Sequence, residues 1–276
     1  MSPAVVFSVA LASLAIVAVW LAFGGRIRAW RDERISLRPF PPGWEAELRR
    51  SMPHYRLLPR RLRVRLRRRI RVFLARKHYL GAEGMPVDDR VRLVIAAYAC
   101  LLVANRPGPA YPAVRDIVVF SGAFATWRRT VDVAGVHGRR REVLAGESWG
   151  AGRVMLAWDE VCELGGRRNV VVHEFAHQLD DEYPGAPGAP PQEDAAGYRA
   201  WSATLGTGYR DLQAALAAGR PTLIDPYAAT GPAEFFAVLS ELFIQDPRAL
   251  RREHPELYAA LRDWYRLDPA AWAVRQ

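Results

Sequence analysis

The sequence predicts an α+β fold, in which a small sheet is combined with several helices and preceded by a transmembrane helix. Three observations support this prediction. Residues 3–23 contain no charged side chain, short β-branched segments lie between residues 115 and 161, and segments with helical periodicity flank them. With 276 residues, of which 50% are hydrophobic, the chain is long enough for one sizeable core.

The uncharged segment at the start of the chain is typical of a membrane anchor. About 21 helical residues at ~1.5 Å each span the roughly 30 Å hydrocarbon core of a bilayer. No basic residue precedes the segment, so we favour a retained anchor over residues 1–25 rather than a cleaved signal peptide. Arginines follow it at once, which places the rest of the chain in the cytoplasm. We expect a single-pass protein of the inner (cytoplasmic) membrane; a cytoplasmic protein is the alternative.

Basic residues are concentrated after this segment. Residues 26–77 hold 18 basic and 4 acidic side chains, which leaves 21 basic and 25 acidic elsewhere. Residues 26–43, rich in arginine and proline, predict a linker before a folded domain of residues 44–276. The uneven charge argues against a nucleic-acid-binding protein, although contact with anionic lipid or an acidic partner stays open.

The remaining elements follow in chain order. Residues 59–81 predict an amphipathic helix that ends near Gly81, and residues 88–105 predict a buried helix capped by Asp88 or Asp89. Residues 115–122, 128–135 and 153–161 are short and β-branched, as in the strands of a small sheet. Helices return after Asn169, and the proline-rich residues 184–191 predict an exposed loop.

Two histidines four residues apart indicate a metal-binding site. In "NVVVHEFAHQLDDEYPG", His173 and His177 lie on one face of the predicted helix, so both imidazoles can point at one zinc ion. Glu174 can reach a water on the open side of the ion and act as a general base. The rest of the helix is apolar, and burying three ionisable groups there without a metal would be costly. We therefore predict a metal centre.

A catalytic zinc ion needs a third protein ligand. The extended HExxHxxGxxH motif is absent, because Asp180 and Tyr183 occupy the positions of its glycine and its third histidine. A later segment, "YAATGPAEFFAVLSELF", offers Glu234 and Glu241, seven residues apart on one helix face. The spacing does not choose between these two glutamates.

The segments "GESW", "NVVVHEFAHQLDDEYPG" and "DPYAATGPAEFFAVLSELF" resemble the Mlc titration factor A family of zinc peptidases, also called the M90 peptidases. The resemblance covers the chain from about Leu57 to Pro269. It implies a zincin-like metallopeptidase domain with one Zn²⁺ ion held by His173, His177 and Glu234, and with Glu174 as the catalytic base. Family members act on peptides, chiefly as aminopeptidases, and the namesake binds a transcription repressor.

Four further residues are candidates around the metal. Tyr227 matches a family tyrosine beside the ion and could stabilise an oxyanion, although a buried structural aromatic is the alternative. Asp180 or Asp181 could accept a hydrogen bond from His177, or could simply cap the helix. Glu241 could support a ligand or be structural.

These residues lead to one functional expectation and one alternative. We expect a membrane-anchored zinc metallopeptidase with aminopeptidase-like activity, whose partners are a peptide or protein substrate and the membrane. The alternative is a module of the same fold that binds a transcriptional regulator and holds a non-catalytic zinc ion.

Overall fold

A computed structural model describes residues 3–131, 137–144, 146–149, 152–162, 166–182 and 187–272, except for the side chains of residues 4–5, 8–22 and 124–149. Its α-helices are α1 (Pro3–Ser36), α2 (Pro42–Ser51), α3 (Arg60–Arg76), α4 (Asp89–Leu102), α5 (Trp158–Cys162), α6 (Val170–Asp180), α7 (Ala195–Ala217), α8 (Pro232–Gln245), α9 (Pro247–Glu253) and α10 (Pro255–Tyr265). Its strands are β1 (His78–Gly81), β2 (Asp116–Phe120), β3 (Phe124–Val131), β4 (His137–Leu144), β5 (Gly146–Trp149) and β6 (Arg153–Ala157). Short 3₁₀ helices are η1 (Pro53–Arg56), η2 (Pro226–Thr230) and η3 (Pro269–Ala271).

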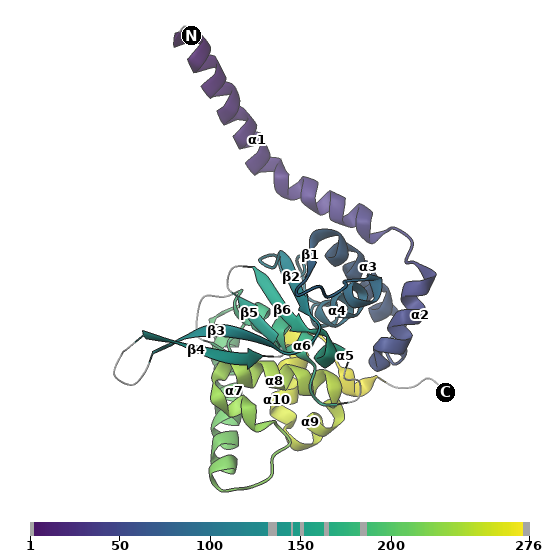
Figure 1. Cartoon of the computed structure of the whole chain (residues 1–276), viewed down its shortest axis with the longest axis vertical. Helices are drawn as coiled ribbons and strands as arrows, with labels where there is room; N and C mark the ends of the chain where they lie inside the picture. The colour runs from purple at the N-terminus through teal and green to yellow at the C-terminus, as the bar shows by residue number, and fades with distance from the viewer. Residues whose placement is uncertain are drawn as a thin grey trace.

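The main sheet has the strand order β1-β2-β6-β5. β1, β2 and β6 are parallel, and β5 runs antiparallel to β6 at the edge. Alternate residues are buried along the central strands, so that Ile117 lies opposite Val154 and Val119 opposite Leu156. This apolar face is where the helices pack. The predicted α+β class is confirmed as a helix-rich fold with a small, mainly parallel sheet (Figure 1).

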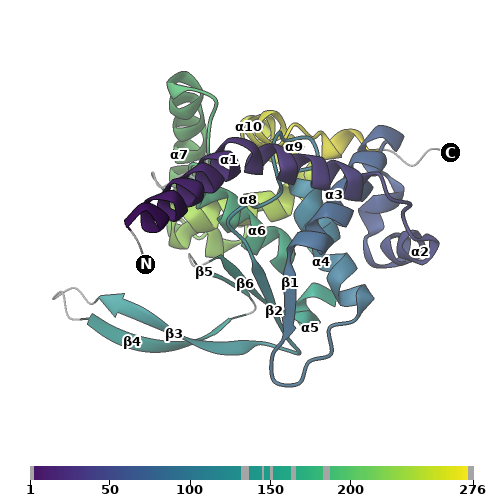
Figure 2. The ribbon, with the colours of Figure 1, turned by 90° about the horizontal axis from the view of Figure 1, so that it is seen from above.

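Helix α4 forms the centre of the core, because its side chains are apolar nearly all round and are buried from Val91 onward, apart from Arg92. Asp88 caps it by accepting a hydrogen bond from the backbone N–H of Val91. Helix α4 contacts α2, α3 and α6, while α6 also contacts β5, β6 and α8. Helix α6 therefore lies between the sheet and the C-terminal helices (Figures 1 and 2). The predicted metal ligands are carried by α6 and by α8, which packs against it.

Three expected elements differ from the structure. The segment predicted as one strand over residues 153–161 is a strand only to Ala157 and continues as helix α5. The helix predicted for residues 59–81 ends at Arg76, because His78–Gly81 instead pair with β2 as a parallel edge strand. The strand expected over residues 128–135 is described only to Val131, and residues 132–136 lie outside the described part. Strand β3 also pairs with β4 in a separate hairpin that extends away from the main sheet (Figure 2).

The N-terminal segment forms a long helix, α1, whose second half lies against α3. Residues 26–36 of the expected linker belong to this helix, and Arg76 of α3 forms an ion pair with Asp32 at 2.6 Å. Among the described residues, no helix has both the length and the apolar character needed to cross a membrane. The predicted transmembrane anchor of residues 1–25 is not supported by this finding, and the side chains of residues 8–22, on which that prediction rests, are outside the described ones.

Candidate metal centre

Helix α6 is fixed in place by its cap and by its apolar face. The side chain of Asn169 accepts a hydrogen bond of 3.0 Å from the backbone N–H of Val172, as expected of an N-cap residue. Val171, Phe175 and Leu179 are almost completely buried, so the helix cannot rotate without exposing them. His173 and His177 are thereby held on the remaining, partly exposed face.

Three predicted ligands meet at one point. The Nε2 atom of His173 lies 3.2 Å from Nε2 of His177 and 3.0 Å from Oε2 of Glu234. The third distance, from Nε2 of His177 to the same Glu234 oxygen, is 3.3 Å. Glu234 comes from the first turn of α8, where Pro232 starts the helix. The fold thus brings together two residues of α6 and one residue of α8 that could hold a metal ion.

The spacing of these atoms fits a tetrahedral zinc ion. Ligand bonds of about 2.0–2.1 Å place the ligand atoms of a tetrahedral site roughly 3.3–3.4 Å apart. The observed separations of 3.0, 3.2 and 3.3 Å are close to that requirement. Two imidazoles and one carboxylate leave the fourth position for water or substrate, as in catalytic rather than structural zinc sites.

The charges around His173 also favour a cation. Burial lowers the pKa of His173, but its hydrogen bonds with Glu234 and Glu241 outweigh this effect and raise the pKa to about 10. Burial raises the pKa of Glu234, but its hydrogen bonds with His173 and His177 outweigh this and hold the pKa well below its usual range. In the protein without metal, a proton therefore supplies the positive charge that a metal ion would otherwise supply.

Glu241 holds the helices α6 and α8 in register. Its Oε1 atom lies 2.7 Å from Nδ1 of His173, and its other oxygen accepts a hydrogen bond from the backbone N–H of Asn169. A donor on Nδ1 leaves Nε2 free to bind a metal, because neutral imidazole carries one proton. Glu241 is thus a supporting residue behind the ligand, and Glu234 is the ligand candidate.

A Glu241→Gln variant is expected to bind zinc about 10–100-fold more weakly than the unchanged chain, as is common when the hydrogen-bond partner of a ligating histidine is altered. The amide accepts a hydrogen bond from Nδ1 less strongly than a carboxylate does, so the imidazole of His173 becomes a less basic and weaker ligand. Zinc competition with a chromogenic chelator measures the change. An exposed glutamate on α10, Glu256, gives the matched Glu256→Gln control; equal zinc affinity of the two variants would contradict this role.

Glu174 is buried beside the ligands and has an unused oxygen. Glu174 is only 4% exposed, and its Oε2 atom has no hydrogen-bond partner among the described residues. Burial raises the pKa of this carboxyl to about 7. A buried oxygen without a partner costs free energy unless water or substrate supplies one. This orphaned acceptor is what a general base next to a metal centre requires.

The buried carboxyl predicts a pH effect on the metal-free protein. The pKa of Glu174 is about 7 in the folded chain and 4.5 ordinarily, so the unfolded chain loses this proton first as pH rises. The resulting loss in the free energy of unfolding, complete above pH 7, is on the order of 3 kcal/mol. Glu174→Gln cannot titrate and does not show this loss. As pH rises from 5 to 8, the free energy of unfolding of the variant minus that of the unchanged chain should therefore increase by about that amount. Urea unfolding with chelator present measures it; parallel pH profiles would contradict it.

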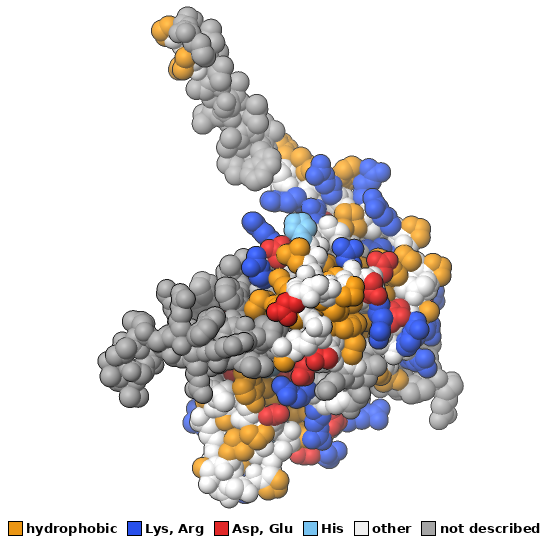
Figure 3. Space-filling view, viewed as in Figure 1, with side chains coloured by type: hydrophobic (Ala, Val, Ile, Leu, Met, Phe, Trp, Pro, Cys, Tyr) orange, Lys and Arg blue, Asp and Glu red, His pale blue; other side chains and the backbone are white. Residues whose placement is uncertain are grey.

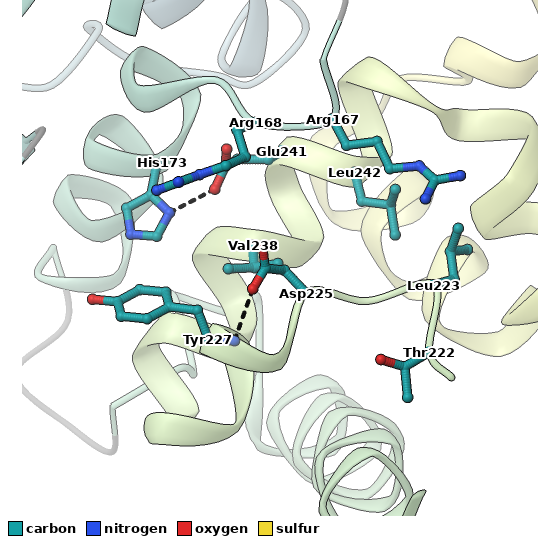
Figure 4. Close-up of a pocket in the computed structure, with 10 residues that line it drawn as sticks. All are labelled: Arg167, Arg168, His173, Thr222, Leu223, Asp225, Tyr227, Val238, Glu241 and Leu242. Atoms are coloured by element: carbon teal, nitrogen blue, oxygen red, sulfur yellow. Dashed lines mark hydrogen bonds and ion pairs between the residues drawn. The ribbon is translucent and has the colours of Figure 1, made fainter. Parts of the chain in front are cut away.

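A cavity of about 370 Å³ opens beside His173. Figure 4 shows the ring of Tyr227 next to that of His173, and the two ring centroids are 6.1 Å apart. Tyr227 is 46% exposed, so the alternative of a buried structural aromatic does not hold. Asp225 fixes the backbone there by accepting a hydrogen bond of 2.9 Å from the N–H of Tyr227. Tyr227 is therefore an exposed residue that lines, together with His173, a cavity next to the candidate metal site.

Asp180 supports a loop next to the metal centre. Its Oδ2 atom accepts a hydrogen bond of 2.6 Å from the backbone N–H of Gly188, which differs from the expected contact with His177. Gly188 has a φ of +78°, and a Cβ there would lie 2.4 Å from the carbonyl oxygen of Pro232 at the start of α8. Asp180 thus fixes the loop against the helix end that carries Glu234. Asp181 is exposed at the C-terminus of α6, where its N–H donates to the carbonyl of His177.

The loop predicted to be exposed is partly buried. Residues 184–186 lie outside the described part, but Gly188, Ala189 and Pro190 are buried. Two tryptophans hold the chain there, because Trp201 donates to the carbonyl of Gly188 and Trp264 donates to that of Pro191, each at 3.0 Å. Proline and glycine indicated an irregular segment correctly, but such composition carries no information about distant hydrogen-bond donors.

An α+β domain with a candidate mononuclear metal centre of two histidines and one glutamate is typical of a metallopeptidase. The family model for the glucose-regulated metallo-peptidase M90 family matches residues 27–266, and the chain belongs to this family. An uncharacterized protein of Synechocystis sp. is 37% identical over 245 residues, covering 87% of this chain and 89% of the relative. Mlc titration factor A of Pectobacterium atrosepticum is 33% identical over 207 residues, covering 72% and 77%.

Proposed function

We propose that the chain is a zinc-dependent peptidase that hydrolyses peptide bonds and prefers substrates with a free N-terminus. The observation that carries this proposal is the meeting of His173, His177 and Glu234 beside a buried glutamate with an unused oxygen. Membership of the M90 family supports peptide hydrolysis, and the choice of zinc follows from the imidazole and carboxylate ligands. The preference for a free N-terminus rests on the family resemblance alone.

The residues of the chain divide the work of hydrolysis. A zinc ion, when bound, would polarise the scissile carbonyl and lower the pKa of a water molecule. Glu174 accepts the proton of the attacking water at its unused Oε2 atom and delivers it to the departing amine. Tyr227, which lines the cavity beside His173, donates a hydrogen bond to the oxygen that becomes negative. Glu241 keeps the ring of His173 oriented throughout.

Removal of the metal is expected to stop hydrolysis, and zinc should restore it. The assay compares an alanyl peptide with its N-acetylated form, before and after treatment with 1,10-phenanthroline. Cleavage of the free peptide alone, lost with the chelator and recovered with zinc, fits the proposal. Cleavage that persists after complete removal of metal would refute the zinc dependence, and equal cleavage of both peptides would refute the preference for a free N-terminus.

A second candidate function is supported by the relatives called Mlc titration factor A. By this reading, the domain binds a transcriptional regulator and any metal is structural. The two functions differ in what His173→Ala does. If the chain is a peptidase, the unchanged chain hydrolyses peptides and His173→Ala does not. If it is a binding module, the unchanged chain hydrolyses peptides no faster than His173→Ala does.

A further inference from the structure

A second cavity lies between α1 and α3, and its lining residues are distant in sequence from the candidate metal ligands. We call it the basic groove; its volume is about 1080 Å³, and it shares no lining residue with the cavity at His173. Figure 3 shows lysine and arginine side chains gathered over this part of the molecule. Eight cationic and two acidic residues line the groove: Arg28, Arg65, Arg68, Arg69, Arg76, Lys77, Arg106 and Arg115, with Asp32 and Glu33.

In the described part of the chain, backbone carbonyls as well as a carboxylate contact these cations. Arg76 is paired with Asp32. Lys77 is buried and donates instead to the backbone carbonyls of Tyr111 and Val114, at 2.6 and 2.7 Å. Arg69 likewise donates to backbone carbonyls, one of them that of Gly108 at 3.1 Å. Carbonyl oxygens satisfy the N–H donors, but they do not cancel the charge.

The surroundings of Lys77 show the excess of positive charge. The pKa of its ammonium group is lowered to about 8, mainly by burial and in smaller part by the nearby Arg76. A buried cation with no carboxylate partner is costly, and an anion in the groove would reduce that cost.

Two arginines in the groove are available to a ligand. Arg68 and Arg115 are exposed, and neither forms an ion pair or side-chain hydrogen bond within the described part of the chain. They come from α3 and from the residue before β2, so they approach the groove from separate segments. Arginine presents several N–H donors in a planar fork that matches the oxygens of a phosphate group.

We propose that the basic groove binds a phosphate-bearing anion, held mainly by Arg68 and Arg115. The groove is larger than one phosphate group requires, which favours a phosphate ester over the inorganic ion. Such an ester can be a soluble metabolite or the headgroup of an anionic phospholipid, and both offer the same oxygens to the two arginines. Helix α1 forms one wall, so a bound ester also fastens α1 to the body of the protein.

Two probes distinguish the sources. The full chain is titrated with sn-glycerol 3-phosphate by calorimetry at low ionic strength, and is sedimented with phosphatidylcholine vesicles with and without phosphatidylglycerol. We expect binding that weakens with added salt. Binding of the soluble ester with no preference between vesicles identifies a soluble ligand; a preference for phosphatidylglycerol vesicles alone identifies a lipid headgroup.

Matched variants test the residues. Arg68→Ala/Arg115→Ala should weaken binding at least tenfold, because two charge-assisted hydrogen bonds are lost. Arg68→Lys/Arg115→Lys should retain most of the binding, and Arg199→Ala/Arg251→Ala, which removes two exposed arginines elsewhere, should not change it. The proposal fails if neither probe binds selectively, if the alanine variant binds as the unchanged chain does, or if only an RNA oligonucleotide binds. None of these outcomes depends on peptide hydrolysis.

Discussion

A Glu174→Gln variant is expected to retain its zinc ion and to lose peptide hydrolysis by about a hundredfold to ten-thousandfold, the usual contribution of a positioned general base. Glutamine has nearly the same shape as glutamate, so the packing of α6 should persist. Its amide cannot accept a proton from water, however. Because Glu174 is not among the three residues whose ligand atoms converge, the metal content should not change.

The measurement needs both activity and metal content. Initial rates on an alanyl peptide give kcat and KM, and elemental analysis of the same samples gives zinc per chain. Glu256→Gln removes an equal charge from the exposed side of α10 and should behave like the unchanged protein. Hydrolysis by Glu174→Gln at the unchanged rate would show that this residue is not the base, whatever the metal content.

The helical part of the site could be predicted from the sequence because it depends on local geometry. Two histidines four residues apart must lie on one face of a helix, and a helix with Val171, Phe175 and Leu179 must bury its opposite face. Both conclusions hold whatever the rest of the chain does. The amphipathic α3 and the capped, buried α4 could be predicted for the same reason.

The choice between Glu234 and Glu241 could not be made from their spacing, because both lie on one face of α8; only the family resemblance favoured Glu234 as the ligand. Seven helical residues separate them by about 10.5 Å along the axis. In the structure the imidazole of His173 lies between the two carboxylates, with Nε2 toward Glu234 and Nδ1 toward Glu241. Only the packing of α8 against α6 determines which glutamate reaches which nitrogen. Their roles follow from that packing and not from their spacing.

The remaining differences also come from long-range contacts. Residues 78–81 have a composition that continues a helix, but the neighbouring strand β2 offers four residues of parallel pairing. Asp180 is well placed in sequence to contact His177, yet its carboxylate accepts a hydrogen bond from Gly188 after the chain has turned back. For residues 78–81, pairing with a strand distant in sequence overrides the local preference for a helix. For Asp180, the folded loop supplies a hydrogen-bond donor that the sequence does not indicate.

Replacing Glu234 with Ala is expected to lower the zinc affinity more than Glu241→Gln does. Changing a residue that only supports a ligand typically lowers metal affinity by about 10–100-fold, and the loss of a ligand should exceed this. The variant keeps both histidines but loses the one carboxylate whose oxygen lies 3.0 and 3.3 Å from their Nε2 atoms. A catalytic zinc ion with two protein ligands is under-coordinated, so hydrolysis should fall with metal content. Zinc per chain and chelator competition measure the loss, ranked against Glu241→Gln.

The order of these variants tests the assignment of the two glutamates. Glu234 lies in the first turn of α8, where an acidic side chain stabilises the helix by about 0.3–1 kcal/mol. The Ala variant should therefore remain folded, which near-UV circular dichroism verifies, and Glu253→Ala on α9 controls for the lost charge. If Glu241→Gln releases zinc more readily than Glu234→Ala does, the roles of the two residues are reversed. In that case the ion would lie on the Nδ1 side of His173, away from His177, and the arrangement derived from the three converging atoms would be wrong.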